Sequence, residues 1–420
     1  MPELKQLELF NETYDFDKMK ALSFKDSKEL PIYNWYPYVE GFSASWLRKE
    51  LDTLSHLDVV YDPFGGSGTT SLECVNRNIS SYYSEVNPFM RFVAETKCNA
   101  SRLAKQNLNQ TDEIFKSFLR YVKSEQFITD SSNMTLVEYE SAFPGREFFE
   151  EEHIKQLLTA RQKVVEIDCE SYIKDLLILS ITSIAVASSN MTRRADLRKR
   201  KPNEYKDRIV NIPVALYKKV NVIFNDLKFV STGEATVTNL NRDARERSTL
   251  AEGSIDLAIT SPPYLNGTNY IRNTKIEIWL AGFIQHEREL KDLRNQMVCG
   301  GITDATKSRL ENLLLFPNVE VIAELLEEDA YDKRIPLMTL SYFSDMYKVL
   351  SNIYYLLKPN GKFVMDIGDS KFGNVHIPTD RLLIELARNI GFEVEYIDKL
   401  ARRYSRDKTE LTQVAIHFRK

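Results

Sequence analysis

The sequence has few cysteines and histidines, no long apolar run and no excess of charge of one sign. Its four cysteines, Cys74, Cys98, Cys169 and Cys299, form no CxxC pair, and 420 residues include only five histidines. These counts argue against a structural zinc site and a disulfide framework. No apolar run approaches the ~20 residues of a membrane span, and MPELKQLELF at the start lacks the basic-then-apolar order of a secretory signal. We expect a cytoplasmic protein with no metal and no membrane partner.

Positive and negative charges nearly balance, with 56 Lys and Arg against 60 Asp and Glu. A surface for nucleic acid would therefore have to come from local patches. RRADLRKRKPNEYKDR (193–208) has eight basic and three acidic residues, and KLARRYSRDK (399–408) has five basic and one acidic residue. Each patch could equally be a solvated loop. The candidate phosphate-contacting residues are Arg193, Arg194, Arg198, Lys199, Arg200, Lys201, Arg402 and Arg403.

Segments with strand character alternate with helical ones along much of the chain. The predicted strands include parts of 57–62, 80–88, 235–245 and 254–260, and apolar residues at helical spacing dominate from about 91 to 232. From 341 to 420, helices and strands alternate regularly, and the last two strands have no helix between them. This order predicts a doubly wound, mostly parallel α/β sheet that ends in an antiparallel hairpin.

The stretch DPFGGSGTT (62–70) joins a predicted strand to a predicted helix through three glycines. Gly65, Gly66 and Gly68 allow a tight turn and a close approach of backbone to a ligand. The spacing is neither GxGxxG nor GxxxxGK[ST], and no lysine follows, which disfavours a P-loop NTPase. The next strand ends at Glu85, where a carboxylate could accept from ribose hydroxyls. A purely structural turn is the alternative.

A second unusual stretch, TSPPY (260–264), directly follows the apolar run SIDLAI. Proline cannot donate to a β ladder and pushes the preceding residue into extended geometry. Two prolines therefore make a stiff exit from the strand that holds Ser261 and Tyr264 in set positions. An ordinary turn between strand and loop is the alternative reading.

Taken together, DPFGGSGTT, SEVNP (84–88) and TSPPY resemble motifs of the DNA amino-methyltransferases, which use S-adenosylmethionine to methylate an exocyclic base nitrogen. The family's FxGxG motif is matched by Phe64, Gly66 and Gly68. Its catalytic motif, (Asp/Asn/Ser/Thr)-Pro-Pro-(Tyr/Phe/Trp), is matched by Ser261, Pro262, Pro263 and Tyr264. An acidic residue that closes the family's third strand is matched by Asp243. WYPYVEGFSASWL (35–47) resembles the helix start over the methionine end of the cofactor, although an ordinary amphipathic helix start is equally compatible.

The resemblance implies a Rossmann-like class I methyltransferase fold with a seven-stranded sheet, S-adenosyl-L-methionine as cofactor and double-stranded DNA as partner. The residues then expected at the cofactor are Phe42, Ser43, Asp62, Phe64, Gly65, Gly66, Gly68, Thr69, Thr70, Glu85 and Asp243. No metal is required for this reaction. A cytosine-C5 enzyme is excluded, because such an enzyme needs a cysteine nucleophile, usually after proline, and none of the four cysteines follows one.

In this family the residue before Pro-Pro relates to the base that is methylated. Ser favours cytosine N4, and Asp or Asn favours adenine N6, so we expect cytosine N4 here, with adenine N6 as the alternative. The Ser261 hydroxyl and the Pro262 carbonyl would accept from the amine, and Tyr264 would stack on a base flipped out of the duplex. RNA base methylation, and a recognition subunit without turnover, are further alternatives to an enzyme of a restriction-modification system.

The motifs also divide the chain. We expect an N-terminal extension (1–33), the first part of the catalytic domain with the cofactor motif (34–90), a helical insertion (91–232) and the second part of the catalytic domain (233–420). The insertion departs from the family pattern, and no separate recognition domain follows the last strand. Target recognition is therefore assigned to the insertion or to the segment 265–338, and the oligomeric state is not predicted.

Overall fold

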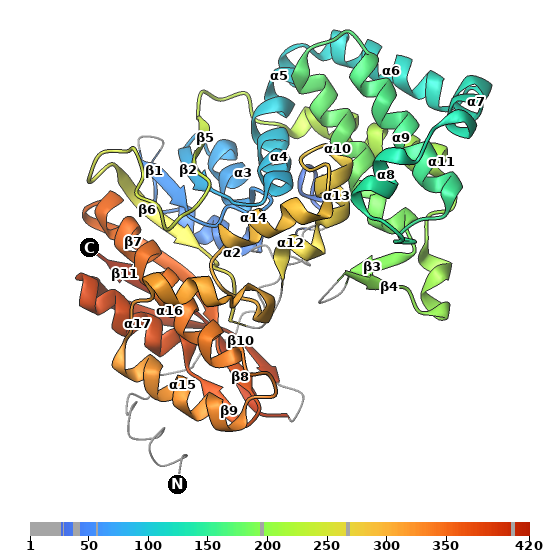
Figure 1. Ribbon diagram of the computed structural model, residues 1–420. Coiled ribbons are helices and arrows are strands. Elements are labelled where there is room, and N and C mark those ends of the chain that lie inside the picture. Colours follow the sequence, from blue (N-terminus) through green and yellow to red (C-terminus); the bar gives the residue numbers. More distant parts are fainter. Residues whose placement is uncertain are drawn as a thin grey trace.

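The computed structural model describes residues 27, 29–36, 43–55, 58–193, 197–265, 269–404 and 408–420, with the side chains of Arg403 and Tyr404 excepted. A seven-stranded sheet runs through the larger lobe in the order β10-β11-β7-β6-β1-β2-β5 (Figure 1). Its strands are β1 Val59–Asp62, β2 Ser80–Ser84, β5 Val237–Asn241, β6 Ile255–Thr260, β7 Leu357–Gly368, β10 Glu393–Tyr404 and β11 Glu410–Arg419.

The pairing of the strands is that of a doubly wound sheet with one reversed strand. β5, β2, β1, β6 and β7 pair in parallel, and β11 lies antiparallel between β7 and β10. The predicted fold class, a mostly parallel Rossmann-like methyltransferase sheet with an antiparallel C-terminal hairpin, is therefore confirmed. The carboxyl ends of the parallel strands meet at one edge, which is where ligands bind in sheets of this kind.

Helices cover both faces of the sheet, because alternate residues of the central strands point in opposite directions. Phe363 and Met365 of β7 belong to one apolar cluster with α16 Ile335–Leu356 and α17 Thr379–Ile390. Val364, between them, belongs to another cluster with Trp46 and Leu47 of α2 Ala44–Leu51, beside α3 Thr69–Asn76. Between β6 and α16 the chain forms α12 Tyr270–Asn273, α13 Lys275–Leu280, η6 Glu287–Glu289, α14 Leu290–Asn295, η7 Ile302–Asp304, η8 Lys307–Asn312 and α15 Pro317–Asp329, and after β7 it forms β8 Ser370–Phe372 and β9 Val375–Ile377. Of these elements, α12, α13 and α14 share an apolar cluster with the helices between β2 and β5.

The chain between β2 and β5 is mainly helical and forms a second lobe, seen at the upper right of Figure 1. Its elements are α4 Pro88–Glu95, η3 Thr96–Ala100, α5 Ser101–Gln106, α6 Leu108–Val122, α7 Glu125–Asn133, α8 Val137–Ala142, α9 Glu151–Glu166, α10 Ser171–Ser188, β3 Met191–Arg193, β4 Leu197–Lys199, η4 Pro202–Asp207, α11 Ile212–Asp226 and η5 Leu227–Phe229. By length and composition α10 could span a membrane, yet most of it is buried inside this lobe, as expected of a core helix.

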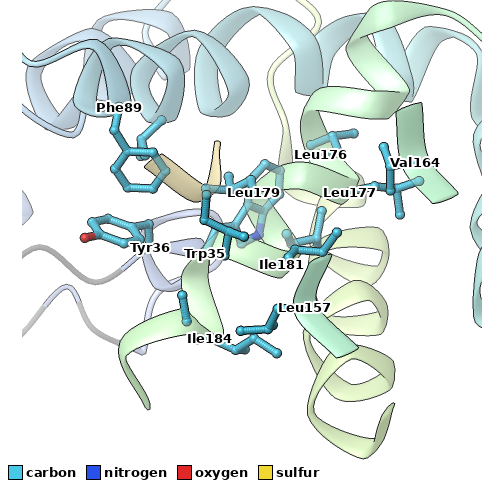
Figure 2. Packing of buried hydrophobic residues seen from close by; sticks show 14 of the residues in the cluster. Trp35, Tyr36, Phe89, Leu157, Val164, Leu176, Leu177, Leu179, Ile181 and Ile184 are labelled. Atoms are coloured by element: carbon cyan, nitrogen blue, oxygen red, sulfur yellow. The ribbon is translucent and has the colours of Figure 1, made fainter. Parts of the chain in front are cut away.

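A short N-terminal segment, η2 Tyr33–Trp35, lies inside the core of the helical lobe. Figure 2 shows Trp35 and Tyr36 among apolar side chains of α9, α10 and α4. Trp35 is fully buried, and its indole Nε1 donates to Asp226 Oδ2 of α11 at 2.9 Å. The backbone of Ile32 donates to the same oxygen at 3.1 Å. The segment just before the predicted cofactor helix is therefore anchored in the insertion.

Candidate functional site

The glycine turn leaves β1 at the carboxyl edge of the sheet and enters α3. Gly68 is the N-cap of α3 with a φ of 82°, and a Cβ there would lie 2.8 Å from the Cβ of Ala94. A Cβ on Gly65 would lie 2.8 Å from a ring carbon of Tyr83. Packing against β2 and α4 therefore explains these two glycines. Gly66 also has a positive φ of 50°, which favours glycine at that position.

One hydroxyl in this turn has no partner. Ser67 is 3% exposed, and its Oγ makes no hydrogen bond within the described parts of the chain. Buried polar atoms nearly always have a partner, so an orphaned hydroxyl in a candidate ligand turn needs an explanation. Sequence reasoning missed Ser67, because it considered only the glycines and threonines of the motif. Its position within a run of glycines was the available signal.

Glu85 lies beside the turn, at the end of β2. Its Oε2 accepts from the Gly66 N–H at 2.9 Å, and its Oε1 accepts from the Asn87 N–H at 2.8 Å. Burial raises the pKa of Glu85 to about 7, and the two backbone donors oppose that rise. A carboxylate oxygen can accept more than one hydrogen bond, so Glu85 keeps acceptor capacity for a ligand hydroxyl. The structure thus brings two of the predicted cofactor elements together.

Asp62, Phe64 and Thr70 form a second group behind the turn. Asp62 Oδ2 accepts from Thr70 Oγ1 at 2.6 Å, and Oδ1 accepts from the Phe64 N–H at 3.0 Å. Asp62, Thr69 and Thr70 are all buried, and Phe64 is half-buried. The Asp62 carboxylate therefore faces protein donors. Of the residues predicted at the cofactor, it is the one whose contacts most clearly serve the fold of the site.

Asp243 follows β5 and is bound to an arginine. Its carboxylate pairs with Arg245, whose Nη2 lies 2.7 Å from Oδ2, and Arg245 also contacts Asp345 of α16 at 3.0 Å. The Asp243 carbonyl accepts from the Asn241 side chain at 3.0 Å, and Asn241 in turn accepts from Ser84 at 2.6 Å. Polar contacts thus join the carboxyl ends of β2 and β5 beside the glycine turn.

The TSPPY loop leaves β6, which lies between β1 and β7. Ser261 is half-buried, and its hydroxyl makes no hydrogen bond to any described residue. Pro262 is buried and Pro263 is half-buried. The Tyr264 hydroxyl donates to Asp366 Oδ1 of β7 at 3.0 Å, and a Cβ on Gly300 would lie 3.1 Å from the Tyr264 carbonyl oxygen. Thr260, at the start of the loop, donates to Asp62 Oδ1 at 2.7 Å, so the loop is held at both ends, with the Ser261 hydroxyl left open.

The helix start expected near residue 43 is present. Ser43 is the N-cap of α2 and is 2% exposed, and its Oγ lies 2.8 Å from Ser45 Oγ. Phe42, the other candidate in this stretch, lies outside the described residues, as does Arg194 of the first basic patch. The role of Ser43 at a cofactor stays a prediction.

Most arginines of the first basic patch have partners within the chain. Arg193 forms an ion pair with Glu277, and Arg198 contacts both oxygens of Glu204 at 2.8 and 2.9 Å. Arg200 donates to carbonyls at the end of α10, including that of Ser189 at 3.1 Å. Lys199 and Lys201 are exposed on the hairpin side of the helical lobe, and Lys199 Nζ lies 3.6 Å from the exposed carboxylate of Glu147. In the second patch, Arg402 is exposed and lies 3.3 Å from Glu410, while the Arg403 side chain lies outside the described part of the chain.

No group of three or more His, Cys, Asp or Glu side chains that could hold a metal ion occurs among the residues that the structure describes. All four cysteines are free thiols. Burial raises the pKa of Cys98 and of Cys299 to about 12.

The chain matches no protein-family model, but it is similar to several curated proteins. It is 25% identical to the type II methyltransferase M.BsoBI of Geobacillus stearothermophilus, over 96% of this chain and 86% of that protein. It is 23% identical to the type II methyltransferase M.AvaI of Nostoc sp., over 90% of this chain and 82% of that one. For the type II methyltransferase M.MvaI of Kocuria varians the identity is 21%, over 88% and 84%.

Among solved structures, a SAM-dependent methyltransferase from Methanosarcina mazei aligns with 87% of this chain and 94% of its own, at 9% identity and a TM-score of 0.28. A score this low carries no weight, so the fold assignment rests on the order and direction of the strands. The alignments with these relatives span most of both chains, and the relatives are methyltransferases, as the motifs indicated. They confirm the resemblance, and the chain is a relative of the S-adenosylmethionine-dependent DNA methyltransferases.

Proposed function

We propose that this protein is a site-specific DNA methyltransferase of a restriction-modification system. The enzyme would methylate the exocyclic amine of a flipped base, and the target atom would be N4 of cytosine. The observation that carries the proposal is the meeting of two elements at one edge of the sheet. The glycine turn with Glu85 and the TSPPY loop leave neighbouring strands, β1 and β6, and Asp62 hydrogen-bonds to both. The type II methyltransferases that resemble the chain support the choice of DNA as substrate.

The residues of the turn fit S-adenosyl-L-methionine as cofactor. The orphaned Ser67 hydroxyl is a buried donor in need of an acceptor, which the cofactor's carboxylate would supply. Glu85 would accept from the ribose hydroxyls, and Asp243 would lie at the adenine end. Ser43 would lie at the methionine end, where α2 begins. When bound, the cofactor supplies an electrophilic methyl group on a sulfonium sulfur.

The TSPPY loop would activate and hold the target base. The lone pair of an exocyclic amine is delocalised into the ring, which makes the nitrogen a poor nucleophile. Acceptors for its two N–H groups would shift the nitrogen towards tetrahedral geometry, and the Ser261 hydroxyl and the Pro262 carbonyl would be those acceptors. The ring of Tyr264, whose hydroxyl donates to Asp366, would stack on the base. Positioning of this kind can supply much of the rate.

Two segments would contact the duplex around the flipped base. The helical insertion 91–232 offers Lys199 and Lys201, and the segment 265–338 packs directly on the TSPPY loop through Gly300. The arginine partners described above leave these two lysines as the strongest candidates for phosphate contact in the first patch.

The proposal is tested by incubating the protein with labelled S-adenosylmethionine and double-stranded DNA and identifying the methylated nucleoside. N4-methylcytosine is the expected product, and N6-methyladenine would move the assignment to the alternative base. A parallel reaction with RNA tests that substrate class. Cofactor binding without transfer to either nucleic acid would instead support a recognition subunit.

The Ser261→Ala variant tests the role of the loop. It removes an acceptor that matters most as the amine nitrogen becomes tetrahedral, so the single-turnover rate should fall more than the affinity for DNA or cofactor. Ser351→Ala removes another half-buried hydroxyl, one that donates to the Tyr347 carbonyl within α16, and serves as a control that should leave the single-turnover rate unchanged. An undiminished rate for Ser261→Ala would mean that the strand simply ends in a turn.

A further inference from the structure

Asp62 hydrogen-bonds to both halves of the proposed site. It is the last residue of β1 and is 1% exposed. On one side its Oδ2 accepts from Thr70 Oγ1, in the first turn of α3, at 2.6 Å. On the other side its Oδ1 accepts from Thr260 Oγ1, at the end of β6, at 2.7 Å. The same oxygen accepts from the Phe64 N–H inside the glycine turn at 3.0 Å.

The three donors account for the charge state of this carboxyl. Burial raises the pKa of Asp62 to about 6, while the bonds from Thr70, Thr260 and Phe64 lower it. At neutral pH the group is therefore a carboxylate in a buried position, which is tolerated because its donors replace water. Both threonines are also buried, with 1% exposure for Thr70 and 0% for Thr260.

These contacts fix two segments that must act on one methyl group. Thr260 directly precedes Ser261, and Thr70 lies two residues beyond the N-cap Gly68. The path from carboxylate to catalytic loop is thus one hydrogen bond and one peptide unit. A misplacement of ~1 Å between reacting groups can cost about 100-fold in rate.

We propose that Asp62 is a positioning residue that sets the catalytic loop relative to the cofactor turn. The inference rests on the proposed function and reassigns Asp62, which the sequence had placed among the cofactor contacts. In this role, the hydrogen bond from Thr260 to Asp62 matters for methyl transfer, and the hydrogen bond from Thr70 to Asp62 matters for the shape of the cofactor turn.

The test uses a matched pair of variants, Thr260→Val and Thr70→Val. Each removes one hydroxyl from the same carboxylate at a fully buried position and keeps the shape of the side chain, so both should lower the urea midpoint similarly. Thr260→Val is expected to lower the single-turnover rate at saturating DNA and cofactor about 10- to 100-fold, with the cofactor Kd by calorimetry little changed. Thr70→Val is expected to raise the cofactor Kd and to affect the saturated rate less.

Thr260→Ser keeps the hydroxyl and should restore most of the rate. If Thr260→Val does not fold, Asp62→Asn, which keeps the shape but weakens the acceptor, takes its place and should show the same loss of rate. The inference is overturned if a folded Thr260→Val or Asp62→Asn protein transfers methyl groups at the wild-type rate, or if the two threonine variants change only the urea midpoint. A wild-type protein that binds cofactor but methylates no DNA would instead refute the proposed function.

Discussion

Glu85 allows a quantitative test of the cofactor site. Its two carboxylate oxygens accept from the backbone N–H groups of Gly66 and Asn87, and the proposed function adds ribose hydroxyls. In Glu85→Gln one carboxylate oxygen is replaced by an NH2 group, which would face the backbone N–H of Gly66 or of Asn87 instead of accepting from it. The variant therefore loses at least one hydrogen bond to a charged group, about 1.5–3 kcal/mol. This corresponds to a cofactor Kd that is weaker by roughly 10- to 150-fold.

The pH dependence of binding provides a second measure. The pKa of Glu85 is raised to about 7, so the carboxyl is ionised above that pH and protonated below it. Binding through the ionised form lowers this pKa, and the Kd should therefore rise about tenfold for each pH unit below 7. Between pH 8 and pH 6 we expect a loss of roughly tenfold in affinity, with proton release on binding in calorimetry near pH 6.5.

The control is another acid whose pKa is raised by burial. The pKa of Asp175, in α10 of the helical lobe, is raised to about 6, so Asp175→Asn changes a titrating group of the same kind that was not predicted at the cofactor. This variant should keep the full pH dependence, while Glu85→Gln should bind weakly and equally between pH 6 and pH 8. If Glu85→Gln retains the wild-type pH dependence, Glu85 is not the group whose ionisation controls cofactor binding.

Three further predictions concern the stacking of the flipped base, the contacts to DNA phosphates and the backbone of the glycine turn. Tyr264→Phe keeps the stacking ring and should retain the 2-aminopurine signal of a flipped base, whereas Tyr264→Ala should lose about 1–3 kcal/mol of capture. Replacing both Lys199 and Lys201 with Ala should reduce the slope of log K against log salt by about 0.9 for each phosphate that is no longer neutralised, and an unchanged slope would show a solvated face. Gly68→Ala and Gly282→Ala each force a positive φ, near 82° and 85°, on a residue with a side chain. That strain costs roughly 1–2 kcal/mol. Only Gly68 also has a close neighbour, which adds about 1–3 kcal/mol, so equal urea midpoints would contradict the packing argument.

The parts of the fold that the sequence predicted correctly carry strong local signals. The glycines after β1 and the two prolines after β6 mark the ends of strands, because glycine readily adopts the positive φ found at Gly66 and Gly68 and proline cannot donate to a β ladder. The C-terminal hairpin was predicted because no helix lies between β10 and β11, and two strands joined by a short connection pair antiparallel. The parallel direction of most strands followed from the rule that alternating strands and helices form parallel sheets, and the number of strands followed from the resemblance, whereas the order of the strands in the sheet was not predicted.

The contacts that the sequence did not reveal are long-range contacts made by charged side chains. Arg193 looked available for phosphate, but its partner Glu277 is 84 residues away, and no local pattern announces that pair. The bond between Asp62 and Thr260 spans 198 residues and appears only when β1 and β6 lie side by side. The ion pair of Arg198 with Glu204 is a local one, because the acid lies within the same basic stretch, and it could have been expected from the sequence.

Trp35 bears on how a protein of this kind could change its target. The indole belongs to the chain that precedes the glycine turn, yet its hydrogen-bond partner and its neighbours belong to the helical lobe (Figure 2). A lobe from a relative could therefore replace this one only if it carried an acceptor in the place of Asp226 and an apolar lining that fits the indole. If the insertion reads the DNA sequence, point substitution of its outer side chains would be the simpler route to a new specificity. The inward faces of α10 and α11 would stay fixed, and drift in specificity would be gradual.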